Sequence, residues 1–172
     1  ERLRRLEAAL DAGAQVVLGP RSLVRDEHAV WVDQAVPAGL AARLGARVEH
    51  AGSPSGWPRG TGSPSELVLD DPGNPLPVGG WIETFAEVAR DTEVLGRARG
   101  GPLDGAPVVV RRGRLTHLGA ASEEAWTATL ALLLGRRPRP AHLEVFERDR
   151  RHVVLDHRAR TLGGLGRISD RD

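Results

Sequence analysis

Apolar residues at helical spacing open the chain and lead into a short apolar run. In ERLRRLEAALDAG, residues 1–13, Leu3, Leu6 and Leu10 fall on one face of a helix, and Gly13 suits the turn that ends it. No Ser, Thr, Asp or Asn precedes this helix as a cap, so we expect the chain to be a piece of a longer polypeptide. AQVVLGP, residues 14–20, predicts a strand that stops at Gly-Pro.

The same order of elements returns in VPAGLAARLGARVEH, residues 36–50. Pro37 suits a first helical turn, Leu40 and Leu44 lie one turn apart, Gly45 is a stop, and residues 46–49 read as a strand. Helices alternating with strands through tight glycine links predict an α/β fold with a parallel, doubly wound sheet.

Short β-rich runs dominate the rest of the chain. Residues 51–64, AGSPSGWPRGTGSP, predict a loop because Gly, Pro and Ser punctuate the segment. VVVRRGRLTHL predicts a hairpin that turns at Arg112 and Gly113. Strand-like runs occupy residues 66–71, 79–88, 92–100, 106–113 and 114–120.

A capped helix follows these runs, and a second hairpin follows the helix. Ser122 is a good N-cap, and the pattern predicts that the helix turns Trp126, Leu130, Leu133 and Leu134 inward. HLEVFERDRRHVVLDH, residues 142–157, reads as two strands about a polar turn. These patterns divide the chain into an α/β domain over residues 1–139 and the start of a small β-domain over 140–172.

Composition excludes several classes of function. Cysteine is absent, which rules out disulfides, thiol nucleophiles and zinc–thiolate sites. A formal net charge of +1 argues against a general nucleic-acid surface, and no segment approaches the apolar length of a membrane span. We therefore expect neither nucleic acid nor membrane as a partner. The histidines show no spacing typical of a metal site, so we also expect no metal and no cofactor.

The loop GPRSLVRDEH, residues 19–28, concentrates charged side chains at the end of a predicted strand. Asp26 and Glu27 are adjacent, and neighbouring residues of a strand face opposite ways, so strand geometry does not make them an opposed acid–base pair. His28 beside them makes only a weak metal motif. Arg21 and Arg25 are open to two interpretations: ion pairs with local acids, or anchors for the carboxylates of a neighbouring chain.

Tryptophans add to this picture. Trp31 follows the charged loop, and Trp57 stands in the Gly/Pro-rich loop, where it suggests an interface anchor or a sugar platform, against simple local packing. We therefore take a set of interface candidates from both loops: Arg21, Arg25, Asp26, Glu27, His28, Trp31 and Trp57. No residue is a catalytic candidate, because no nucleophile has a base within an evident constellation.

Taken together, these segments resemble the middle, or trimerisation, domain of glycoside hydrolase family 42 β-galactosidases. DAGAQVVLGPRSLVRDEHAVWVDQAVPAGLAARLGARVEHAGSP is similar to that domain, and GGWIETF, TEVLGRA and GAPVVVRRGRLTHLG are similar to its later segments. LEVFERDRRHVVLDH is similar to the start of the family's C-terminal β-domain. The family's pattern P-G-x-L-x-x-x-L-G-x-x-V-E is similar to residues 37–49, which read P-x-G-L-x-x-x-L-G-x-x-V-E. The matching residues are Pro37, Gly39, Leu40, Leu44, Gly45, Val48 and Glu49.

The resemblance implies a three-layer α/β fold like that of class I glutamine amidotransferases, lacking its first βα units. It implies a β-galactosidase as parent, with two further copies of the chain (a homotrimer) and the parent's catalytic barrel as partners. The absence of cysteine separately makes a reducing cytoplasm the expected compartment. The family's catalytic glutamates lie in that barrel. Where amidotransferases carry their cysteine, this chain has Pro20, Arg21 and Ser22. An assembly domain is thus expected; the alternative is a stand-alone amidotransferase-like enzyme or small-molecule-binding domain.

Overall fold

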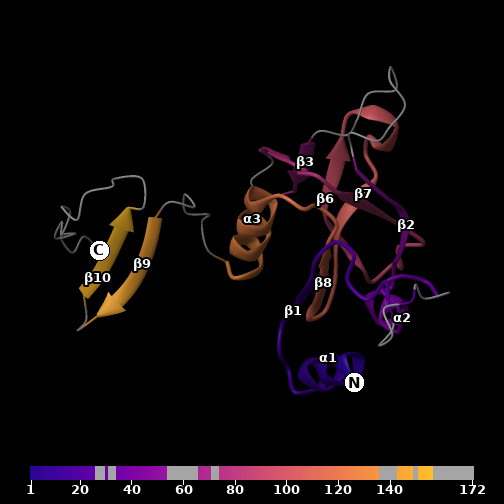
Figure 1. Cartoon of the computed structure of the whole chain (residues 1–172), viewed down its shortest axis with the longest axis horizontal. Helices are drawn as coiled ribbons and strands as arrows, with labels where there is room; N and C mark the ends of the chain where they lie inside the picture. The colour runs from indigo at the N-terminus through magenta and orange to yellow at the C-terminus, as the bar shows by residue number, and fades with distance from the viewer. Residues whose placement is uncertain are drawn as a thin grey trace.

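The computed structural model describes residues 1–25, 30, 34–53, 66–70, 74–135, 143–148 and 151–156. Its helices are α1 (Arg2–Asp11), α2 (Ala41–Leu44) and α3 (Glu123–Leu133), with one 3-10 turn, η2 (Gly101–Leu103). Its strands are β1 (Val16–Leu18), β2 (Arg47–Gly52), β3 (Glu66–Leu69), β4 (Pro75–Pro77), β5 (Ile82–Ala86), β6 (Glu93–Arg99), β7 (Pro107–Arg112), β8 (Leu115–Leu118), β9 (Leu143–Arg148) and β10 (Arg151–Asp156). Figure 1 shows these elements along the chain.

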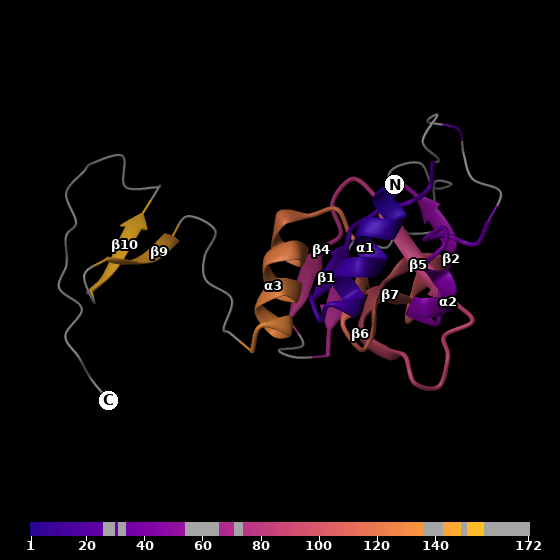
Figure 2. The same ribbon diagram turned by 90° about the horizontal axis from the view of Figure 1, so that it is seen from below.

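A curled six-stranded sheet forms the centre of the fold, in the order β1-β8-β7-β6-β3-β4. Strands β2 and β5 pair separately as an antiparallel ribbon. α3 lies on one side of the sheet and α2 on the other, as both Figure 1 and Figure 2 show. The expected α/β class is therefore confirmed at the level of a mixed fold with helices beside a sheet.

The predicted parallel sheet is wrong for most of the described strands. Only β1 and β8 run parallel, whereas the other four neighbouring pairs of the sheet are antiparallel. Parallel neighbours need a crossover of a dozen or more residues. From β6 to β8 the connections are short: β6 reaches β7 through η2, and β7 turns into β8 through Gly113 and Arg114. Such tight turns return the chain antiparallel.

Two clusters of buried residues hold the layers together. One joins the α3 side to the sheet and includes Leu67, Leu69, Val109 and Leu118. The other includes Leu10 of α1 and Leu44 of α2, packed with Phe85, Val110 and Leu115. The predicted inner face of the first helix is confirmed, because Leu3 and Leu6 pack against this second cluster and Leu10 is buried.

Local stop and cap signals also agree with the structure. Gly45 ends α2 with a φ of 68°, a left-handed conformation that favours glycine. The Ser122 hydroxyl accepts a hydrogen bond from the Ala125 amide at 3.1 Å and caps α3. The helix after Pro37 is shorter than predicted, because a turn in which the Pro37 carbonyl accepts from Leu40 and Ala41 precedes α2.

The predicted inward face of α3 is only partly right. Its buried positions are Ala125, Ala128, Thr129 and Ala131, and Trp126 is half-buried against the same cluster. Leu130 and Leu134 are instead 40% and 64% exposed. Small residues let the helix axis approach the sheet closely, so the larger leucines are left outside the contact.

The C-terminal hairpin forms as predicted. β9 and β10 pair antiparallel in register from Leu143 with Asp156 to Arg148 with Arg151. They form a two-stranded sheet of their own.

Candidate functional site

The turn that follows β1 has an unusual backbone. After Leu18 the chain passes Gly19 and Pro20 into Arg21 and Leu23, whose φ angles are 62° and 56°. A non-glycine residue in this region costs about 1–2 kcal/mol, so the surrounding structure must hold it there. The strand ends before Gly19 and Pro20, as predicted, although only Leu18 of its three residues is buried, and it leads into a strained elbow.

Glu83 of β5 holds that elbow through a side-chain hydrogen bond to its backbone. Its carboxylate Oε1 accepts the backbone N–H of Arg21 at 2.7 Å and the indole Nε1–H of Trp81 at 3.3 Å. The Glu83 residue is only 1% exposed. A carboxylate that accepts a backbone N–H makes a strong, charge-assisted hydrogen bond, which offsets the strain at Arg21.

His117 of β8 completes the buried cluster. Its Nε2 lies 3.1 Å from the other carboxylate oxygen, Oε2, of Glu83, and the His117 residue has no exposed surface. The ring also meets Phe85 edge-on, with centroids 4.9 Å apart. A buried polar pair of this kind is stable only while both side chains keep their hydrogen bond, because neither can turn to water instead.

A glycine allows β5 to come this close to the end of β8. The Gly119 carbonyl accepts the Glu83 N–H at 2.7 Å, and the Gly119 N–H donates to Val108 at 2.8 Å. A Cβ at Gly119 would lie 2.2 Å from the backbone carbonyl oxygen of Glu83. Only glycine permits this approach, and it is the approach that brings the carboxylate of β5 to the histidine of β8.

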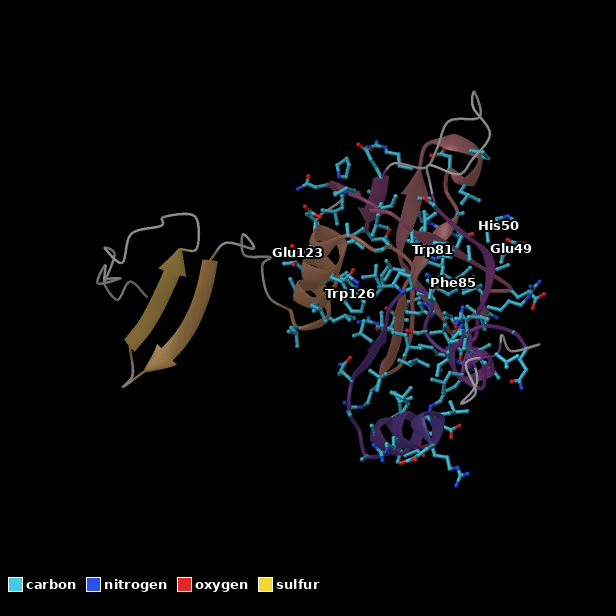
Figure 3. All side chains as sticks on the ribbon, in the orientation of Figure 1. Glu49, His50, Trp81, Phe85, Glu123 and Trp126 are labelled. Atoms are coloured by element: carbon cyan, nitrogen blue, oxygen red, sulfur yellow. The ribbon has the colours of Figure 1, made fainter. Side chains whose placement is uncertain are left out.

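Arg21 and Trp81 form the outer layer of the site. The guanidinium carbon of Arg21 lies 5.1 Å from the centroid of the Trp81 ring, within the range of a cation–π contact. Arg21 is exposed and Trp81 half-buried. Trp126 of α3 lies against Gly19 at the base of the same turn, on the side of α3 that faces the sheet (Figure 3). Arg21, Trp81, Glu83 and His117 are called the elbow cluster below.

The predicted interface residues are only partly within the described structure. Arg21 and Arg25 are described, and both are exposed at the end of β1. Asp26, Glu27, His28, Trp31 and Trp57 lie outside the described residues, so their grouping stays a prediction. Sequence reasoning did not select Trp81, Glu83 or His117 as site residues. Glu83 and His117 are 34 residues apart in the sequence and become neighbours only through the pairing of strands.

The chemistry of the elbow cluster is that of a clamp. The chain holds no cysteine, and an arginine occupies the elbow, where it cannot act as a nucleophile. The imidazole Nε2 already faces Glu83. Within the described ranges, no group of three or more His, Asp or Glu side chains could hold a metal ion. Among the helices that the structure describes, none is long and apolar enough to cross a membrane.

The family model described as "Beta-galactosidase trimerisation domain" matches residues 1–139. No curated protein matches the sequence.

Several solved β-galactosidases share the fold. The polyextremophilic enzyme of the Antarctic haloarchaeon Halorubrum lacusprofundi is 25% identical with a TM-score of 0.67, over 90% of this chain and 24% of that one. The Bacillus circulans sp. alkalophilus enzyme is 18% identical (TM-score 0.63; 88% and 24% covered), and that of the psychrophilic Marinomonas ef1 is 20% identical (TM-score 0.62; 89% and 22%). The chain thus spans about a quarter of the length of the solved proteins it resembles.

Proposed function

Because the chain belongs to the β-galactosidase trimerisation domain family, we propose that it is the assembly domain of a glycoside hydrolase family 42 β-galactosidase and does not itself cleave sugar. The match over residues 1–139 carries this proposal. The elbow supports it, since the position after β1 holds an arginine on a buried Glu83–His117 pair and offers no nucleophile. A clamped, charged turn suits contact with another protein surface.

The parent would act on β-galactosides in the cytoplasm through a catalytic barrel elsewhere in the polypeptide. Sugar hydrolysis of this kind needs two opposed carboxyl groups, one of them kept protonated as the acid. In the described part of this chain Glu83 is the buried carboxylate, and its partners are His117, Trp81 and the Arg21 amide. That arrangement suits a structural role, and the hydrolytic carboxylates belong to the barrel.

Three copies of the parent would assemble through this domain. A cyclic trimer uses head-to-tail contacts, so one surface of the domain meets a different surface of the next subunit. We place one of these surfaces on the loops that carry Arg21, Arg25, Asp26, Glu27, His28, Trp31 and Trp57. Guanidinium groups and tryptophans are the residue types that most often anchor interfaces.

The finer fold proposal is an amidotransferase-like sheet completed in the parent. β1 pairs parallel with β8 and stands at the end of the six-strand order. An open strand edge invites a further strand. Additional βα units joining at β1 would extend the parallel part of the sheet, as in the class I glutamine amidotransferases.

The test is the mass of the full-length parent over a dilution series, measured by light scattering. We expect a trimer that dissociates on dilution, and Trp31→Ala or Trp57→Ala to weaken it more than Glu27→Ala, since a buried aromatic anchor contributes more than a rim charge. A monomeric parent at every concentration would contradict the assembly role. Turnover of a chromogenic β-galactoside by the 172-residue chain, lost on mutating Asp26 or Glu27, would show the chain to be an enzyme instead.

A further inference from the structure

Resting on the proposed assembly function, we infer that Arg21 and Trp81 form a carboxylate-binding platform that receives an Asp or Glu side chain from a second copy of the chain. The inference assigns the platform its ligand class and assigns Glu83 the role of a positioning residue. It starts from the geometry of the elbow cluster: a strained arginine, an indole beside it, and a buried carboxylate beneath both.

The side chain of Arg21 differs from those arginines of the structure that pair with acids of their own chain. Several arginines are satisfied by acids of their own chain, in the pairs Arg43–Asp11, Arg47–Glu87, Arg111–Glu93 and Arg112–Asp91. Arg21 is exposed, and within the described part of the chain its guanidinium contacts the Trp81 ring and pairs with no carboxylate. Among the described residues, its guanidinium N–H donors have no carboxylate acceptor, and we infer that a second copy supplies one.

A carboxylate is the group that fits such a guanidinium. The planar fork of arginine matches the two oxygens of a carboxylate, and a guanidinium is less strongly hydrated than an ammonium, so it is readily used at interfaces. The indole beside Arg21 restricts the side chain before any partner binds, which lowers the entropy that binding must overcome. A second copy is the occupant favoured by the match to a trimerisation domain, because such a domain assembles with copies of itself.

Glu83 fixes the direction in which the platform faces. Its Oε1 accepts a hydrogen bond from each residue of the platform, from the Arg21 backbone N–H at 2.7 Å and from the Trp81 indole N–H at 3.3 Å. Its Oε2 is held by His117 at 3.1 Å. The left-handed backbone of Arg21 is unfavourable without this hydrogen bond. Loss of the carboxylate would release the elbow and let the guanidinium leave the ring, although Arg21 itself is unchanged.

The experiment measures the trimer dissociation constant of the full-length parent by sedimentation at several salt concentrations. Arg21→Ala is expected to weaken each subunit contact about tenfold, the effect of losing a close interfacial charge pair. It should also flatten the salt dependence, because a screened ion pair is gone. Arg21→Lys should fall between, since it keeps the charge and loses the fork. Arg97→Ala, an exposed arginine of β6 that donates to the Gly105 carbonyl, is the matched control and should leave the constant unchanged.

A double-mutant cycle separates positioning from general destabilisation. If Glu83 acts through Arg21, Glu83→Gln weakens assembly in the wild type and adds nothing in the Arg21→Ala background, even where the melting temperature falls in both. Equal dissociation constants and salt slopes for wild type and Arg21→Ala would overturn the platform. Additive effects of the two substitutions would overturn the positioning role. In both cases a parent that is still trimeric leaves the assembly function intact, whereas a monomeric wild type refutes that function itself.

Discussion

Removing the Glu83 carboxylate is the perturbation with the largest predicted effect on stability. Glu83→Ala leaves three groups without their acceptor: the Arg21 amide, the Trp81 indole and the His117 ring. A buried donor left without a partner costs about 1–3 kcal/mol. Arg21 and Trp81 are partly exposed and can recruit water, but His117 has no exposed surface and cannot.

His117 contributes about 1–3 kcal/mol and the two donors that can recruit water contribute less, so the total is about 2–4 kcal/mol. Domains of this size are stable by roughly 5–15 kcal/mol, so the variant would lose a large part of its stability. The assay is urea unfolding of the 172-residue chain followed by circular dichroism. Glu93→Ala is the control, because Glu93 pairs with Arg111 at 2.6 Å on the surface and its loss should cost at most about 1 kcal/mol. Equal costs for the two variants would refute the reasoning.

Three further predictions concern other parts of the fold. Gly119→Ala should destabilise the chain by about 1–3 kcal/mol or more, because its Cβ would lie 2.2 Å from a backbone oxygen, while Gly80→Ala, which meets nothing within 4 Å, should change the free energy of unfolding by less than about 1 kcal/mol in the same urea experiment. Arg47 holds the pKa of the Glu87 carboxyl below its ordinary value through a hydrogen bond and its charge, so Arg47→Gln should raise the Glu87 pKa in an NMR titration. A lowered pKa stabilises the fold at pH values above the unfolded-state pKa, and this stabilisation is lost as the pH falls through the folded-state pKa, so the variant should lose part of the wild type's dependence of stability on acid pH. An unchanged Glu87 pKa in the variant would contradict the ion pair. Leu134→Gln should lower the free energy of unfolding of the isolated chain by under about 0.5 kcal/mol, because that side chain is 64% exposed. A loss of several kcal/mol would instead show that Leu134 faces inward, as predicted from the sequence.

Signals confined to a few residues were readable from the sequence. The Ser122 cap, the Gly45 stop and the leucine face of α1 each depend on neighbours within about one or two helical turns. Most strand positions were readable for the same reason. However, β4 was not predicted, and β2 runs to Gly52, into the loop predicted for residues 51–64. The remaining strands were predicted close to their observed bounds.

Features that depend on pairing between distant segments were not readable. Helix–strand alternation at the start predicted a parallel sheet, but the later tight turns impose antiparallel pairing. The elbow cluster has the same origin. Glu83 and His117 sit in ordinary strand patterns, and only the close approach at Gly119 makes them partners. The arginine of the loop was predicted to matter, but the residues that hold it were not.

Hydrogen exchange on the full-length parent tests the central claim most directly. Exchange is compared in the same protein above and below the concentration at which it dissociates. The account predicts that assembly slows exchange in peptides from residues 1–139, with the turn around Arg21 among the most protected. Protection confined to peptides outside residues 1–139 would contradict the assignment of this chain as the assembly domain.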